Sequence, residues 1–218
     1  MEIRVRDDCV EIEGYVNAIE RNSKPLWSRA GQFVERVCKG AFARALERNH
    51  NVRILLNHEE DRDLGGTADG NLELCEDAIG LHARACIYDK DVREDALAGN
   101  LVGWSFGFTD TDNGVERSID TDTGLPLRKL RDLNLKEVSI LNRAKSPAYE
   151  GTLVTVRSEE EVQFRSEIFI DDIKTEEIKS EQVEETREEQ PQQTEESEAN
   201  KVDLSELKQM IKEMKGES

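Results

Sequence analysis

The chain has 218 residues, among them 48 Asp and Glu against 30 Lys and Arg, which gives a formal net charge of −18. This length suffices for one domain with a sizeable core and an appendage, but hardly for two full domains. The negative charge would repel phosphate and argues against general binding of nucleic acid. No apolar run approaches the roughly 18 residues that a membrane-spanning helix needs, so we expect a soluble protein that is not exported and does not bind a membrane.

The first third of the chain combines alternating segments with one helix. Residues 3–5 and 9–19 alternate apolar with polar side chains, which predicts two half-buried strands joined by a tight turn. After a loop, the pattern predicts a helix over residues 40–50. Residues 52–56 then form the short apolar run that is typical of a buried strand.

The middle of the chain adds more short strands, never in regular alternation with helices. This pattern predicts a mainly β (α+β) fold, a small antiparallel β-barrel with a few surrounding helices. We expect the folded body to end near Arg157. The expected elements are a hairpin of residues 71–75 and 81–88, a helix at 91–98, and strands at 101–108, 115–119, 133–141 and 152–156.

The composition changes after residue 157. Residues 158–200 hold sixteen acidic and four basic side chains, a net of −12, and are rich in Glu, Gln, Ser and Thr. Such a segment cannot bury enough apolar surface to offset its ordering entropy, so we expect a disordered acidic linker. Residues 201–218 predict a short amphipathic helix, with apolar residues at spacings of three and four, that orders only against a partner.

The four cysteines, Cys9, Cys38, Cys75 and Cys86, are scattered along the chain with no Cys-x-x-Cys pair. No histidine stands near them at metal-ligand spacing. Their arrangement favours reduced thiols in a cytosolic protein.

One serine stands out because it lies between two glycines in an apolar run, as Gly103-x-Ser105-x-Gly107. This pattern also fits the nucleophile elbow of α/β-hydrolases, in which a histidine follows the serine in the sequence. All three histidines of this chain precede Ser105, so the elbow interpretation fails. A serine hydrolase with its histidine before its serine remains open, because triads are recognised by geometry and role.

The three histidines differ in their surroundings. His50 ends a helix, where an imidazolium is favoured by the helix dipole, and His82 shares an alternating face with Arg84, which indicates exposure to solvent. His58 follows a buried strand at the head of a polar loop, the position from which scaffolds commonly present catalytic side chains.

Glu137 lies within an apolar, alternating strand. By alternation it shares a face with Leu133, Leu135, Ser139 and Leu141, which places its carboxylate among apolar neighbours. A carboxylate held there needs a hydrogen-bond donor, and an imidazole N–H would serve. An edge glutamate paired with Lys136 or an arginine is the plainer interpretation.

Other arrangements around His58 stay open at this point. Glu59, Glu60 and Asp61 are rival partners for the imidazole, or weak candidates for a metal site with it. Arg143 is a speculative contributor to an oxyanion hole, with a surface loop arginine as the alternative.

Several short blocks occur in an order that resembles the prohead maturation protease family of tailed bacteriophages, itself related to the herpesvirus assemblin serine proteases. The resemblance covers roughly residues 3–156. The blocks are GQFVERV at 31–37, GAF at 40–42, VRILLNH at 52–58, LGGT at 64–67, LEL at 72–74, GL at 80–81, GWSFGF at 103–108, LKEVSI at 135–140 and PAY at 147–149.

The resemblance implies a serine endopeptidase of capsid maturation with an assemblin-like fold. Ser105 matches the family nucleophile, His58 its general base and Glu137 the acid of the third block, which would orient the imidazole. The implied substrate is the scaffold protein or the scaffolding segment of the major capsid protein, inside the assembling procapsid in the host cell cytoplasm. Self-cleavage between body and tail is expected, a homodimer is compatible with the assemblin likeness, and no cofactor or metal is implied.

Two other functions compete with this one. In the first, the chain is a non-catalytic scaffold or assembly protein whose barrel has lost activity and whose tail does the work; in the protease interpretation the helix at 201–218 is instead expected to dock the enzyme on scaffold or capsid. In the second, it is a serine hydrolase of the esterase type that acts on small substrates.

Overall fold

A computed structural model describes residues 1–143, 154–157, 160–168 and 173–179 of the chain. All of them belong to one compact unit, Met1–Glu181. The expected amphipathic helix at 201–218 and the greater part of the expected acidic linker lie outside the described residues. The described part is mainly β, as the sequence predicts, and its strands form three sheets.

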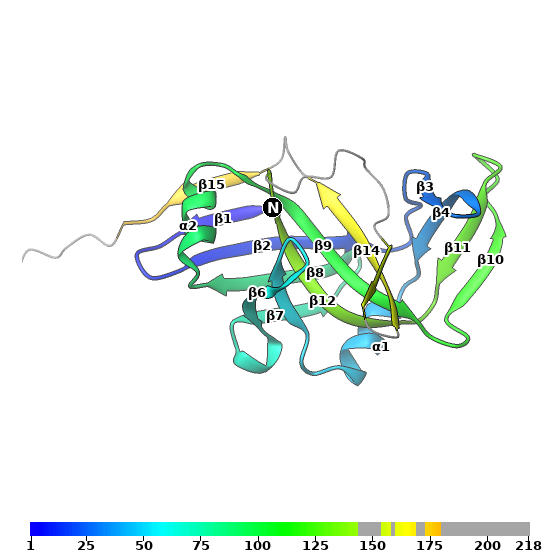
Figure 1. The fold of residues 1–218 in the computed structure, drawn as a ribbon, viewed down its shortest axis with the longest axis horizontal. Coiled ribbons are helices and arrows are strands. Elements are labelled where there is room, and N and C mark those ends of the chain that lie inside the picture. Colours follow the sequence, from blue (N-terminus) through cyan, green and yellow to red (C-terminus); the bar gives the residue numbers. More distant parts are fainter. Residues whose placement is uncertain (144–153, 158–159, 169–172, 180–218) are drawn as a thin grey trace, which may run out of the picture. The chain divides into compact units, whose positions relative to one another are not determined.

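The first sheet has five strands in the order β15-β1-β2-β8-β7 (Figure 1). Its N-terminal strands follow the alternation of the sequence, since Ile3, Val5, Val10 and Ile12 are all buried. β1 pairs in parallel with β15 and antiparallel with β2. The strands are β1 (Glu2–Val5), β2 (Val10–Ala18), β7 (Leu72–Glu76), β8 (Gly80–Ile87) and β15 (Lys174–Glu177).

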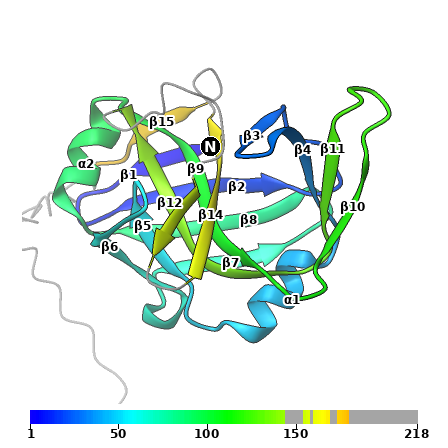
Figure 2. The same cartoon turned by 45° about the vertical axis from the view of Figure 1, so that its right-hand side comes forward.

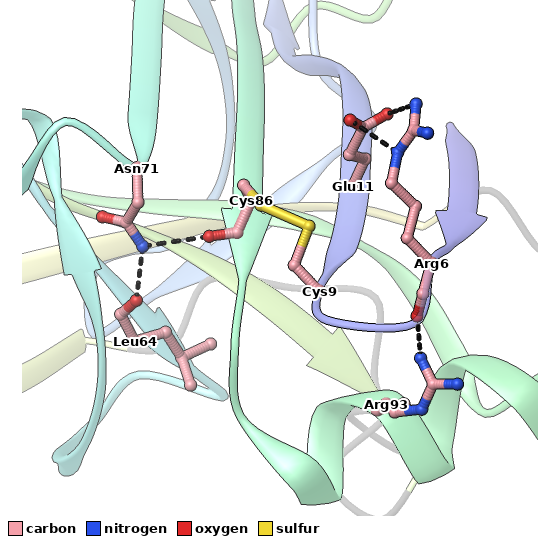
Figure 3. The surroundings of a disulfide bond; sticks show 7 residues. All are labelled: Arg6, Cys9, Glu11, Leu64, Asn71, Cys86 and Arg93. Atoms are coloured by element: carbon pink, nitrogen blue, oxygen red, sulfur yellow. Dashed lines mark hydrogen bonds and ion pairs between the residues drawn. A yellow bond between two sulfur atoms is a disulfide. The ribbon is translucent and has the colours of Figure 1, made fainter. Parts of the chain in front are cut away.

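A disulfide bond joins Cys9, just before β2, to Cys86 on the neighbouring strand β8 (Figure 3). The expectation of four reduced thiols is therefore wrong for this pair. Sequence spacing could not reveal the bond, because 77 positions separate two residues that only sheet pairing brings together. Cys38, which is buried, and Cys75, which is exposed, are free thiols.

The second sheet has four strands in the order β10-β11-β4-β3, and β11 pairs in parallel with β4 (Figure 2). Its central strand β4 carries Glu35, a buried carboxylate. The strands are β3 (Leu26–Ser28), β4 (Gly31–Val37), β10 (Val115–Ile119) and β11 (Pro126–Leu130).

The third sheet has six strands in the order β13-β14-β9-β12-β5-β6, and it contains the segment around Ser105. Figure 2 shows β14, β9 and β12 side by side as its long central strands. Trp104, Phe106 and Phe108 of β9 are fully buried on the core side. The strands are β5 (Arg53–Leu56), β6 (Glu59–Gly66), β9 (Leu101–Asp110), β12 (Leu133–Asn142), β13 (Val154–Arg157) and β14 (Glu160–Ile168).

Two α-helices and a short 3-10 helix, η1 (Thr67–Asp69), complete the described residues. Helix α1 (Ala41–Arg48) buries Phe42, whose ring meets that of Phe106 edge-on at 5.2 Å. Helix α2 (Lys90–Leu97) begins after Asp89, whose side chain accepts a hydrogen bond from the backbone N–H of Val92, a common N-cap arrangement. No helix in this part of the chain is long and apolar enough to cross a membrane.

The architecture differs from the expected barrel in two respects. No closed barrel is found among the described strands, which instead form three sheets with three parallel pairs, β1–β15, β11–β4 and β12–β5. In addition, β14 and β15 follow the point near Arg157 where we expected the folded body to end. Alternation predicts that a segment is a strand, but it does not identify the partner or the direction of pairing.

Candidate active site

His58 lies in the two-residue turn between β5 and β6. Asn57 and His58 both have a left-handed backbone, with φ of 55° and 62°, a combination that matches the type I′ hairpin turn. The turn is attached to β12, because the Asn57 N–H donates to the carbonyl of Ile140 and the Asn57 side chain bonds that of Asn142 at 2.9 Å. A left-handed histidine is uncommon, and its surroundings hold it in place.

An ion pair stabilises the same hairpin from its outer side. Arg53 of β5 makes two hydrogen bonds to the carboxylate of Asp63 on β6, at 2.9 and 2.7 Å. These bonds, together with one from the Gly65 N–H, hold the pKa of Asp63 below its usual range.

The imidazole of His58 contacts a buried carboxylate. His58 Nδ1 lies 2.7 Å from Glu137 Oε1, and the side chains are 11% and 5% exposed. Ser139 Oγ donates to Glu137 Oε2 at 2.6 Å and accepts from the His58 backbone N–H at 3.2 Å. Both carboxylate oxygens are thus held, and the imidazole is oriented through its Nδ1 nitrogen.

A β-bulge in β12 places Glu137 on this side of the sheet. The pairing with β9 shifts between Leu135, which faces Phe108, and Glu137, which faces Gly107. Leu135 therefore points into the core, whereas Glu137 and Ser139 point to the opposite face. The expectation that Glu137 and Ser139 share a face with Leu133 and Leu135 is wrong, because simple alternation does not allow for the extra residue.

Ser105 lies on the same face as Glu137 and Ser139. It is directly opposite Ser139 in the β9–β12 pairing, and the residue is fully buried. Its Oγ donates to the carbonyl oxygen of Arg165 at 2.8 Å and accepts from Ser166 Oγ at 3.1 Å. The hydroxyl proton is therefore directed at β14 and not at the imidazole.

Strand β14 pairs with β9 along the edge opposite to β12. Phe164 pairs with Gly107, and its ring centroid lies 4.3 Å from that of His58. β14 was not predicted from the sequence, although Val162 and Phe164 alternate with polar residues as a half-buried strand requires. The surrounding acidic residues obscured this signal.

The remaining candidate site residues lie elsewhere or have ordinary structural surroundings. His82 faces Glu13 at 3.5 Å and Tyr15 edge-on, and His50 is exposed. Arg143 is also exposed. The carboxylate at His58 Nδ1 is that of Glu137 and comes from none of the neighbouring acids, and the described residues contain no group of three or more His, Cys, Asp or Glu side chains that could hold a metal ion.

A serine, an imidazole and a carboxylate on one face of one sheet are the side-chain types of a serine hydrolase. The family model for caudovirus prohead serine proteases matches residues 1–165, so the chain belongs to that family. Its members are serine proteases of phage capsid maturation that act within the procapsid. No curated protein and no solved structure matches the chain significantly.

Proposed function

We propose that the protein is a serine endopeptidase in which Ser105 is the nucleophile, His58 the general base and Glu137 the residue that orients the imidazole. The observation that carries this assignment is the 2.7 Å contact between His58 Nδ1 and Glu137 Oε1 on the face that bears Ser105. The substrate is the scaffold protein or the scaffolding segment of the major capsid protein, and the enzyme also cleaves itself.

The arrangement supports a general-base mechanism. With Nδ1 held by Glu137, the other ring nitrogen, Nε2, is the one that accepts the Ser105 proton as Oγ attacks the scissile carbonyl. Glu137 stabilises the imidazolium that forms, and the same proton then passes to the leaving amine. For this step the Ser105 hydroxyl proton has to turn away from the Arg165 carbonyl.

Ser139 positions the imidazole and its orienting carboxylate. Its hydroxyl links the carboxylate of Glu137 to the backbone N–H of His58, so it fixes the ring and its orienting acid relative to each other. A buried carboxylate without such donors would cost several kcal/mol, which is why a hydroxyl at this position stabilises the charged form.

The deciding experiment compares the wild type with Ser105→Ala in an assembly reaction that contains scaffold and capsid precursor. We expect trimming of the precursor to fall by several orders of magnitude in the variant. Ser118→Ala, on β10 in a different sheet, is the matched control and should trim normally. Trimming at the normal rate by Ser105→Ala would show that Ser105 is not the nucleophile, as a non-catalytic assembly protein requires. Turnover of small esters without peptide cleavage would favour the esterase alternative.

A further inference from the structure

We propose that β14 lies in the active site as the protein's own substrate, that the bond between Arg165 and Ser166 is a self-cleavage site, and that Glu35 recognises the basic side chain before that bond. This inference rests on the proposed role of Ser105. It defines a substrate class, namely an extended peptide with Arg or Lys immediately before the cleaved bond.

The carbonyl group of Arg165 lies beside the proposed nucleophile. It accepts the hydrogen bond of the Ser105 hydroxyl at 2.8 Å, and the next residue, Ser166, is the register partner of Ser105. β14 runs antiparallel along β9 from Gln163 to Ile168, so it binds as an added strand, the way in which many extended peptides are recognised. The peptide bond nearest the nucleophile is therefore that between Arg165 and Ser166.

The Arg165 side chain occupies a site built from other elements. Its guanidinium makes two parallel bonds to Glu35 of β4, Nε to Oε1 at 2.5 Å and Nη2 to Oε2 at 2.8 Å, and both residues are buried. Its Cζ also lies 5.1 Å from the ring centroid of Phe108. Two-point pairing and stacking on an aromatic face are the contacts that favour arginine over lysine.

The charge of this site favours a basic occupant. Without Arg165, the site would hold two carboxylates, Glu35 and Asp110, against the single guanidinium of Arg128, which bonds both. A neutral or acidic side chain in place of Arg165 would leave a buried negative charge without full compensation.

The aromatic residue before Arg165 contacts the catalytic imidazole. Phe164 packs against His58 with ring centroids 4.3 Å apart, so the strand touches both proposed catalytic groups. Beyond Gln163, β14 pairs with β9 alone among the described strands, and Ser166 is exposed. This half of β14 can leave β9 without breaking a second ladder, and its departure would free the same edge of β9 for a substrate strand from another chain.

The reaction follows from these contacts. Ser105 Oγ bonds to the carbonyl carbon of Arg165, while His58 takes the hydroxyl proton and delivers it to the nitrogen of Ser166 as the C–N bond breaks. Water then hydrolyses the Arg165 ester and restores Ser105. One product ends in the carboxylate of Arg165, and the other begins at Ser166 and carries the acidic segment.

The test is mass spectrometry of the full chain over time, with Ser105→Ala as the blank. We expect a Ser105-dependent fragment whose first residue is Ser166. Arg165→Lys should keep most of this cleavage, and Arg165→Gln should slow it by at least about tenfold, because it removes the charge that Glu35 binds. An intact Arg165–Ser166 bond in protein that trims its precursor would overturn the inference, as would Ser105-dependent cleavage at other bonds only.

A second measurement does not depend on the folding of the Arg165 variants. The wild type acts on the peptide Val-Gln-Phe-Arg-Ser-Glu and on the same peptide with Gln in place of Arg. We expect kcat/KM to favour the arginine peptide by at least about tenfold, and Glu35→Gln to reduce that ratio toward one. A ratio that Glu35→Gln leaves unchanged would contradict the role of Glu35. If the wild type shows no Ser105-dependent cleavage of either peptide, the proposed function itself is contradicted.

Discussion

The carboxylate of Glu137 lies directly against the backbone of Gly107 on the neighbouring strand. A Cβ atom added to Gly107 would stand 2.5 Å from Glu137 Oε1 and 2.9 Å from Phe164 Cε1. The second glycine beside Ser105 therefore provides the space in which the carboxylate reaches His58.

Gly107→Ala should displace Glu137 and impair cleavage. We expect a loss of about 1–3 kcal/mol in the free energy of unfolding from overpacking, together with a fall in precursor trimming. Gly70→Ala is the control, since its φ of 76° makes any side chain strained but no atom lies within 4 Å. Urea unfolding and the assembly reaction measure both effects. Trimming in Gly107→Ala equal to that of the control would contradict the account.

Glu137→Gln should abolish most of the activity and leave the fold intact. An amide cannot stabilise the imidazolium as a carboxylate does, and the equivalent change in a serine protease triad lowers kcat by about 10⁴. We expect kcat on the peptide Val-Gln-Phe-Arg-Ser-Glu to fall by a factor of roughly 10³–10⁴. Glu116→Gln removes an exposed ion pair with Arg131 and should keep full activity. A Glu137→Gln enzyme within tenfold of the wild type would rule out the orienting role.

Ser139→Ala should lower kcat and leave KM unchanged. The change removes one donor to Glu137 and one acceptor of the His58 N–H, a loss worth about 1–3 kcal/mol, or roughly 5- to 150-fold in rate. Ser139→Thr keeps the hydroxyl and should restore most of the rate. If alanine and threonine give the same kcat, the hydroxyl has only a packing role.

The four cysteines should differ in their reactivity toward iodoacetamide. Burial raises the pKa of the Cys38 thiol, so we expect slow alkylation there and fast alkylation of the exposed Cys75. Cys9 and Cys86 should react only after reduction. Peptide mapping with and without reductant, with Cys75→Ser as control, checks this order. Alkylation of Cys9 without reductant would show that the disulfide is absent.

Asp63 should contribute stability that acid removes. Because the Arg53 hydrogen bonds lower its pKa in the folded state, the contribution is present above the usual carboxyl range and lost as pH falls through the lowered folded value. The pair is partly exposed, so Asp63→Asn should cost about 1 kcal/mol or less at pH 7. Urea unfolding at neutral and strongly acid pH measures the difference. A difference that does not shrink in acid would refute the ion-pair origin.

The sequence identified two of the site's main features for sound physical reasons. A serine between glycines in an apolar strand and a histidine directly after a buried strand both stand out in one sequence. The structure places them in one sheet, Ser105 on β9 and His58 after β5, with β12 between these two strands. Glu137 also stood out, yet its orientation followed from a bulge at Lys136 that alternation cannot show. Ser139 was missed as a partner because a serine in a strand gives no distinctive pattern.

Other features depend on contacts between distant parts of the chain. The segment from Glu59 to Gly66 looked like a polar loop but pairs with β5, whose other edge is already covered by β12. β14 is acidic in composition and is stabilised by Glu35, 130 positions earlier. Such strands are fixed by tertiary partners, which local propensity does not encode.

The most direct test of the central claim is covalent labelling with a fluorophosphonate while the enzyme is trimming its precursor. The account predicts a single modified residue, Ser105, and loss of labelling in both Ser105→Ala and His58→Ala. Stoichiometric labelling of Ser139, Ser166 or another serine, or an unlabelled protein that continues to trim, would contradict it.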